Sequence, residues 1–147
     1  MIQIRDNVFE TNSSSTHSMT IVPMSEYMEW VENKDILFNM DTNELGTFVS
    51  REAAIEAVRE IDKFYRDSSW YHPIESYMWY DAPDDDSIRM CKNIDDVPEK
   101  YVDKYLAYHQ FYTYYEYEQY DELEKYSEKY ETQSGDKIVI FGTYGMD

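Results

Sequence analysis

Cysteine is almost absent from this chain, in which Cys91 is the single cysteine among 147 residues. One cysteine cannot form an intramolecular disulfide, and no cysteine cluster is present that could hold zinc. The sequence therefore excludes the disulfide framework of small secreted proteins, and a reducing cytoplasm is the expected location.

Glycine and proline are also scarce, with four of each, and no long hydrophobic run occurs. The longest strongly apolar run covers residues 138–141, whereas a transmembrane helix needs roughly 20 residues. The first ten residues lack the basic and apolar regions of a signal peptide. We expect a folded protein that is neither exported nor embedded in a membrane.

Basic side chains are too few to balance the acidic ones. The chain has 13 Lys and Arg against 31 Asp and Glu, which gives a formal net charge of −18. Most of such a surface repels DNA, RNA and anionic lipid. Direct binding to nucleic acid or to a membrane is therefore not expected.

Several motifs that carry chemistry are missing as well. The chain has no Gly-rich phosphate loop, no HExxH and no CxxC. The acidic run Asp84 to Asp86 lacks the glycine and the final glutamate of an EF-hand loop. The sequence therefore predicts no metal site and no cofactor.

The residues that are present indicate an α+β fold in a single domain over residues 1–147. Hydrophobic residues make up 42% of the chain, enough for a core at this length. Short strands are predicted over residues 1–9 and 17–22, and a Val/Ile-rich strand over residues 137–141 is expected to pair with them. The expected architecture is a small antiparallel or mixed sheet packed by two or three helices.

Two of these helices have clear signals. Ser50 is predicted to cap a helix over residues 51–65, because apolar residues recur there at helical spacing. A long acidic, tyrosine-rich helix is predicted over residues 97–130, since no Gly or Pro follows its first turn until Gly135. Thr113 marks a point at which this helix can be interrupted.

Tyrosine is concentrated in the long predicted helix, which holds ten of the sixteen tyrosines. Five of them form a heptad-like stripe: Tyr101, Tyr105, Tyr108, Tyr112 and Tyr115. Such a stripe packs in a core or covers a partner, as tyrosine often does at interfaces. Both interpretations stay open, and a homodimer formed through the stripe is a further one.

Carboxylates are densest in the same segment, with seven between residues 116 and 131. A solvated helix face is one interpretation. The other is phosphate mimicry, in which carboxylates occupy the basic groove of a nucleic-acid-binding protein and exposed tyrosines add anchors. The predicted partner-binding residues are Tyr114, Glu116, Tyr117, Glu118, Asp121, Glu122, Glu124, Glu128, Asp84, Asp85 and Asp86.

Short polar side chains crowd into a predicted turn over residues 10–16, between the first two predicted strands. One interpretation is a structural loop held by side-chain to backbone hydrogen bonds. Another is a phosphate or nucleotide site, or a small enzyme with a serine nucleophile and a histidine base. The residues of this alternative ligand site are Asn12, Ser13, Ser14, Ser15 and His17.

The stretch VFETNSSSTHSM over residues 8–19 resembles the N-terminal signature of small proteins encoded by bacteriophages and mobile elements of Gram-positive bacteria. The resemblance covers about twenty residues and implies a setting, the cytoplasm of an infected bacterial host, but no activity. By charge and size, the chain is similar to anti-CRISPR and other anti-restriction inhibitors, many of which imitate DNA.

These observations lead to two hypotheses of different classes. The first is a non-enzymatic phage inhibitor that binds a host nucleic-acid-binding protein, a CRISPR effector above all, through its acidic C-terminal half. The second is a nucleotide-binding module, either a sponge for a defence signal or a small enzyme, built on the polar N-terminal turn.

Overall fold

The computed structural model describes residues 4–10, 15–40, 44–66, 74, 86–89, 91–119 and 124–146. The chain groups into two compact units. The sheet unit combines Met1–Lys34 with Glu118–Asp147, and the helical unit is Asp35–Tyr117. The α+β class predicted from the sequence is confirmed, whereas the single domain stays a prediction.

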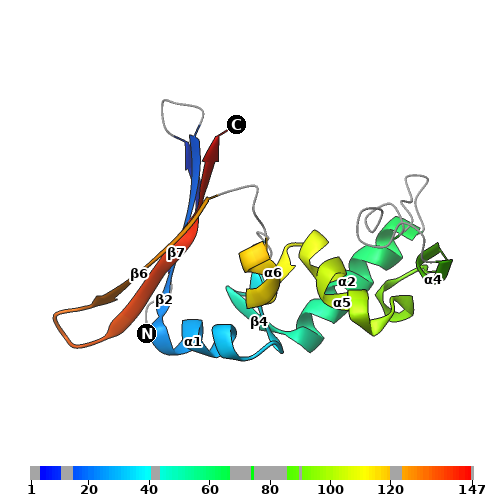
Figure 1. Ribbon diagram of the computed structural model, residues 1–147, viewed down its shortest axis with the longest axis horizontal. Coiled ribbons are helices and arrows are strands. Elements are labelled where there is room, and N and C mark those ends of the chain that lie inside the picture. The colour runs from blue at the N-terminus through cyan, green and yellow to red at the C-terminus, as the bar shows by residue number, and fades with distance from the viewer. Residues whose placement is uncertain are drawn as a thin grey trace. The chain divides into compact units, whose positions relative to one another are not determined.

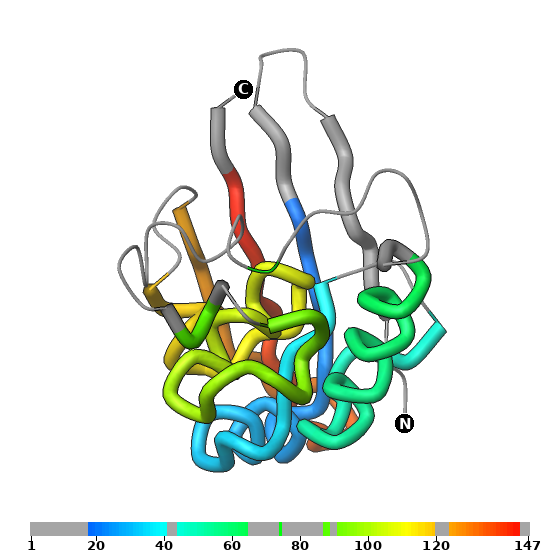
Figure 2. Tube along the Cα trace, turned by 90° about the vertical axis from the view of Figure 1, so that its right-hand side faces the viewer, coloured from blue at the N-terminus to red at the C-terminus, as the bar shows by residue number. Residues whose placement is uncertain are grey.

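The sheet unit contains a four-stranded antiparallel sheet with the strand order β1-β2-β7-β6. In both ribbon and tube views β2 lies beside β7 (Figures 1 and 2). The predicted pairing of the Val/Ile-rich C-terminal strand with an N-terminal strand is confirmed for β2, whereas β1 pairs with β2 and not with β7. The strands are β1 (Ile4–Glu10), β2 (Ser15–Pro23), β6 (Glu124–Glu131) and β7 (Lys137–Met146).

Helix α1 (Met24–Glu32) covers one face of this sheet. Its Trp30 ring stacks on Phe141 of β7 at a centroid distance of 5.5 Å, and its Tyr27 ring approaches Phe141 at 5.2 Å. Val22 and Val139 are fully buried. Apolar burial on this face is the main source of stability of the sheet unit.

The helical unit combines a three-stranded antiparallel sheet, in the order β4-β3-β5, with helices. Its strands are β3 (Ile36–Asn39), β4 (Phe48–Ser50) and β5 (Phe111–Tyr112). Its helices are α2 (Arg51–Arg66), α4 (Asp86–Arg89), the 3₁₀ turn η1 (Ile94–Asp96), α5 (Glu99–Tyr108) and α6 (Tyr114–Gln119), the last of which crosses into the sheet unit. No helix among the described residues combines the length and the apolar character required to cross a bilayer.

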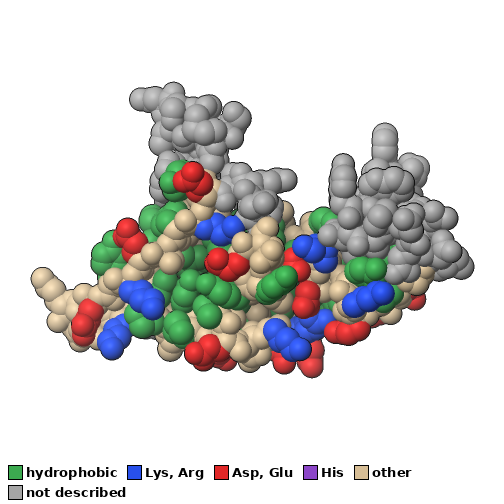
Figure 3. Space-filling view, viewed as in Figure 1, with side chains coloured by type: hydrophobic (Ala, Val, Ile, Leu, Met, Phe, Trp, Pro, Cys, Tyr) green, Lys and Arg blue, Asp and Glu red, His purple; other side chains and the backbone are tan. Residues whose placement is uncertain are grey.

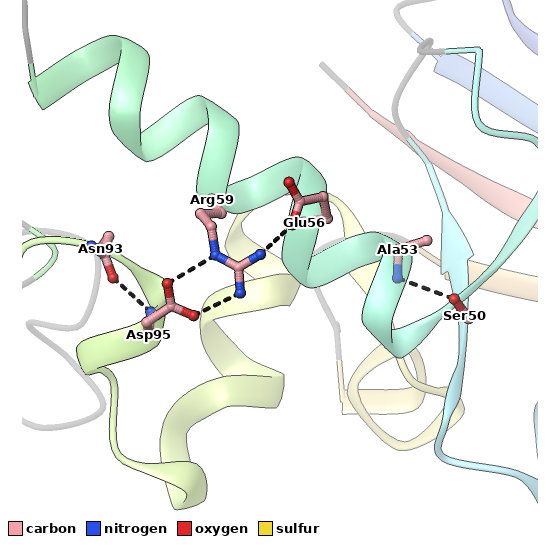
Figure 4. A network of polar contacts seen from close by, with 6 residues as sticks. All are labelled: Ser50, Ala53, Glu56, Arg59, Asn93 and Asp95. Atoms are coloured by element: carbon pink, nitrogen blue, oxygen red, sulfur yellow. Dashed lines mark hydrogen bonds and ion pairs between the residues drawn. The ribbon is translucent and has the colours of Figure 1, made fainter.

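Helix α2 begins as the sequence predicts. The backbone N–H of Ala53 donates to Ser50 Oγ at 3.1 Å, so Ser50 caps the first turn. Further along α2, the Arg59 guanidinium donates from Nε and from its Nη2 atom to the two carboxylate oxygens of Asp95, at 2.8 Å each (Figure 4). This fork ties α2 to η1 and lowers the pKa of Asp95.

The core of the helical unit lies between α2, α5 and the small sheet. Its fully buried side chains include Leu37, Ala54, Val58, Leu106 and Phe111. Tyr105 of the predicted tyrosine stripe is also buried, so at least this member of the stripe belongs to the core.

The long helix predicted over residues 97–130 is wrong. Helix α5 ends before Gln110, whose φ of 73° lies in the left-handed region that stops an α-helix. Thr113 Oγ1 then accepts a hydrogen bond from the backbone N–H of Glu116 at 3.1 Å and starts the short helix α6. The break near Thr113 therefore exists, and beyond it the segment becomes β6 instead of resuming the helix.

Sequence spacing explains the error at β6. Tyr126 and Tyr130 are four residues apart, and a spacing of four places side chains on one face of either a helix or a strand. No Gly or Pro lies between Pro98 and Gly135, so the sequence lacks the residues that usually mark the end of a helix. Pairing with the Val/Ile-rich β7 decides the conformation, because tertiary context overrides local propensity.

Candidate protein-binding face

Two of the predicted partner-binding residues are committed to the interior. The Glu116 carboxylate is buried and forms an ion pair with Lys104 Nζ at 2.8 Å. The Tyr117 ring is buried and contacts Phe38 edge-on at a centroid distance of 5.7 Å. Helix α6 has six residues, and the side of it that carries Glu116 and Tyr117 faces the core. These two residues are therefore not part of the binding surface.

The remaining predicted residues fall into three groups. Tyr114 on α6 is half-buried, while Glu118 on α6 and Glu124 and Glu128 on β6 are exposed. Asp86, the last residue of the acidic run, is the first residue of α4. Outside the described residues lie Asp84, Asp85, Asp121 and Glu122.

The exposed glutamates of β6 lie on a face of the sheet that α1 does not cover. Val139, Phe141 and Thr143 of β7 are buried on the α1 side, so the alternating residues of β7 point to the opposite side. Residues directly opposite each other in the β6–β7 register share a face. We call the β6–β7 part of this side of the sheet the outer face, which consists of Glu124, Tyr126, Glu128, Tyr130, Ile138, Ile140, Gly142 and Tyr144.

The outer face combines exposed rings with a partly exposed apolar floor. Tyr130 and Tyr144 expose 47% and 40% of their surface. Ile138, Ile140 and Tyr126 are half-buried. On the side of the molecule seen in the space-filling view, hydrophobic side chains lie exposed among charged ones (Figure 3).

Each of the two exposed tyrosines of the outer face donates its hydroxyl hydrogen to a glutamate. The Tyr130 hydroxyl donates to Glu128, its neighbour on the same face of β6. The Tyr144 hydroxyl donates to Glu124, which lies directly across the β6–β7 pair. In both cases the hydrogen bond, followed by the negative charge of the glutamate, raises the pKa of the tyrosine, because the carboxylate favours the neutral phenol over the phenolate.

The third tyrosine of the outer face supports the sheet. Tyr126 lies opposite Gly142, and its hydroxyl donates to the backbone carbonyl of Ser18 on β2 at 2.7 Å. Burial, followed by the charge of Glu128, raises the pKa of Tyr126. A Cβ atom on Gly142 would lie 2.0 Å from the Ser18 carbonyl oxygen, so only glycine permits this close approach.

Tyrosine titration provides a test of the two Tyr–Glu pairs. We expect Glu124→Gln and Glu128→Gln to lower the pKa of Tyr144 and Tyr130, respectively, toward the ordinary value of about 10, because the amide removes the negative charge. A raised tyrosine pKa stabilises the fold below pH 10, and this contribution disappears as the pH rises through the raised value. Phenolate absorbance as a function of pH measures the change, and Glu32→Gln on α1 serves as the control. Titration curves that coincide with that of the unmodified protein would contradict the pairing.

The polar N-terminal motif is only partly described. Ser15 and His17 belong to β2, where they pair with Met146 and Tyr144 of β7. Thr16 also pairs within the sheet, and Glu10 ends β1, so the predicted turn over residues 10–16 is shorter than expected. These residues of β2 adopt strand conformation because β2 forms backbone hydrogen bonds with β1 on one side and with β7 on the other. Asn12, Ser13 and Ser14 lie outside the described residues.

Within the part of the chain that the structure describes, no three His, Cys, Asp or Glu side chains gather in a way that could hold a metal ion. No protein-family model, no curated protein and no solved structure matches this chain.

Proposed function

We propose that this protein is a phage-encoded inhibitor that binds the basic, nucleic-acid-binding surface of a host defence protein, with a CRISPR effector as the leading candidate. The observation that carries the proposal is the outer face, where exposed carboxylates and exposed tyrosine rings lie together on a hydrogen-bonded sheet. Protein interfaces favour tyrosine and a partly apolar centre.

Charge supports this kind of partner. A chain with a formal net charge of −18 is attracted to basic surfaces from a distance and is repelled by nucleic acid. Glu124 and Glu128 lie four residues apart on one side of β6, which places their Cα atoms about 13 Å apart along the strand. Carboxylates fixed in this way can take the place of phosphates against lysine and arginine side chains.

Charge reversal tests the proposal at the described carboxylates. We expect the triple variant Glu118→Lys, Glu124→Lys, Glu128→Lys to bind its captured partner at least about 100-fold more weakly, because each reversal replaces an attraction by a repulsion. The measurement is capture by the tagged protein from a bacterial lysate that contains CRISPR effectors, washed at low and high salt and challenged with DNA. Captured protein should be released by salt and by competing DNA.

The matched control reverses three exposed glutamates of the helical unit: Glu44, Glu52 and Glu60. Both triple variants change the formal net charge by +6, from −18 to −12, so only the position of the charges differs between them. Equal loss of binding in a folded control would show that the outer face is not the binding surface. Retained binding in the folded test variant would overturn the proposed function.

A further inference from the structure

The two Tyr–Glu pairs of the outer face repeat the same arrangement. In each pair a glutamate carboxylate accepts a hydrogen bond from a phenol whose ring stays exposed, with Glu128 beside Tyr130 and Glu124 beside Tyr144. The centroids of the Tyr126 and Tyr144 rings are 6.4 Å apart, so these two rings form a continuous aromatic surface next to Glu124. The face therefore offers two anionic positions, each next to an aromatic ring.

This combination fits a guanidinium group better than an ammonium group. Each carboxylate has lone pairs beyond the one that accepts the phenol, and arginine donates two parallel N–H groups to such an acceptor. The planar guanidinium also stacks on an exposed tyrosine ring, whereas the compact lysine ammonium is held more strongly by water. The half-buried Ile138 and Ile140 provide apolar contact for the methylene stem of an arginine.

Charge complementarity also selects among possible occupants. A second copy of this chain that docked the same face would bring four carboxylates together, two from each outer face. Lys125 and Lys129 of β6 alternate to the opposite face of the strand, so β6 adds no lysine to the outer face. An arginine-bearing segment of a basic protein has the complementary charge.

We propose that the outer face recognises arginine in preference to lysine, with one guanidinium at Glu128 and Tyr130 and a second at Glu124 and Tyr144. The proposal rests on the proposed function and specifies the chemistry of its partner. The two recognised side chains reach positions about 13 Å apart along β6, so they extend from separated residues of the partner.

The experiment compares an arginine homopeptide with a lysine homopeptide of equal length, each titrated calorimetrically into the purified full chain. We expect the arginine peptide to bind about tenfold more tightly, from two exposed cation–π contacts. Tyr130→Leu with Tyr144→Leu should reduce this ratio to near one, while binding of the lysine peptide stays unchanged. Tyr130→Phe with Tyr144→Phe keeps both rings and should keep the preference.

The control replaces two exposed aromatic residues of the helical unit, Tyr115 and Phe64, by leucine. This variant should keep the arginine preference. Equal affinities for the two peptides in the unmodified protein, or an arginine preference that survives the Tyr130→Leu and Tyr144→Leu changes, would overturn the inference. So would a dimer in solution that these two changes dissociate, because the face would then belong to a second copy.

Failure of this inference is distinguishable from failure of the proposed function. If capture from the lysate depends on Glu124 and Glu128 but the peptides bind equally, the proposed function stands and arginine recognition is wrong. If no lysate protein depends on these glutamates, the proposed function fails whatever the peptides show.

Discussion

Replacing Trp30 with alanine should lower the free energy of unfolding of the sheet unit by about 3–5 kcal/mol. Trp30 is fully buried, and its ring packs on Phe141 and contacts Tyr27 at centroid distances of 5.5 and 5.7 Å. Alanine loses this apolar burial and leaves a cavity between α1 and the sheet, which rigid strands cannot fill completely. The same change should also destabilise the outer face. Alternate residues of β7 pack against α1 and form part of the outer face, so a disturbance of β7 affects both sides.

Urea unfolding followed by circular dichroism measures this effect without depending on the indole signal. Glu29→Ala is the matched control, since Glu29 is an exposed residue on the same helix. We expect the control to change the free energy of unfolding by less than about 0.5 kcal/mol. A Trp30→Ala variant as stable as this control would show that α1 does not stabilise the sheet in the manner described.

The second large effect is expected at Asp62, a buried carboxylate in the helical unit. Asp62 accepts hydrogen bonds from the Tyr105 hydroxyl at 2.6 Å and from the backbone N–H of Ile94 at 2.8 Å. Asp62→Ala leaves both buried donors without this acceptor, so we expect a loss of about 2–4 kcal/mol in the free energy of unfolding. Asp62→Asn keeps an acceptor oxygen and should lose less.

The pH dependence of stability gives an independent measurement of the same group. Burial is the main cause that raises the pKa of Asp62, while the hydrogen bonds from Tyr105 and Ile94 and the nearby His109 partly oppose it. A raised carboxyl pKa contributes stability below its unfolded value of about 3.9, and this contribution is lost as the pH rises through the folded value.

The difference in stability between the unmodified protein and Asp62→Asn should therefore be most favourable to the unmodified protein in acid and decrease toward neutral pH. Chemical unfolding of both proteins across this range provides the comparison. A difference that is constant with pH would show that Asp62 does not titrate with a raised pKa. Asp96→Asn, at an exposed carboxyl of the neighbouring η1, is the control.

The elements that the sequence predicted correctly are those with local signals. Ser50 is followed by apolar residues at helical spacing, so both the start and the course of α2 could be inferred. The Val/Ile-rich segment of β7 has a strong strand preference, and its partner β2, which also pairs with β1, has the same kind of signal. In these elements the local preference and the final pairing agree.

The candidate site was only partly predictable for the opposite reason. Glu124 and Glu128 were identified from charge density alone, while Tyr130 and Tyr144 were not chosen as site residues. Their proximity depends on β6 pairing with β7, which a helix over residues 97–130 conceals. One signal was available: in β6 Glu and Tyr alternate with other residues at a period of two, which is typical of a strand with two different faces.

Burial of α6 could not be predicted because it depends on contacts distant in sequence. Glu116 lies in a run of acidic residues, yet it pairs with Lys104 of α5, and Tyr117 packs against Phe38 of β3. Charge density alone gives no indication of which member of an acidic run turns inward.

The position of the helical unit within the sequence has a consequence for biosynthesis. The two parts of the sheet unit flank it, and Ser18 on β2 meets Thr143 on β7 across 125 residues of chain. During translation β2 therefore emerges long before its partner strand exists, while most contacts of the helical unit join residues that are synthesised within one continuous stretch. The helical unit has the opportunity to fold first, and closure of the sheet, with its high contact order, becomes the slow step. The outer face is thus assembled only after β7 has left the ribosome.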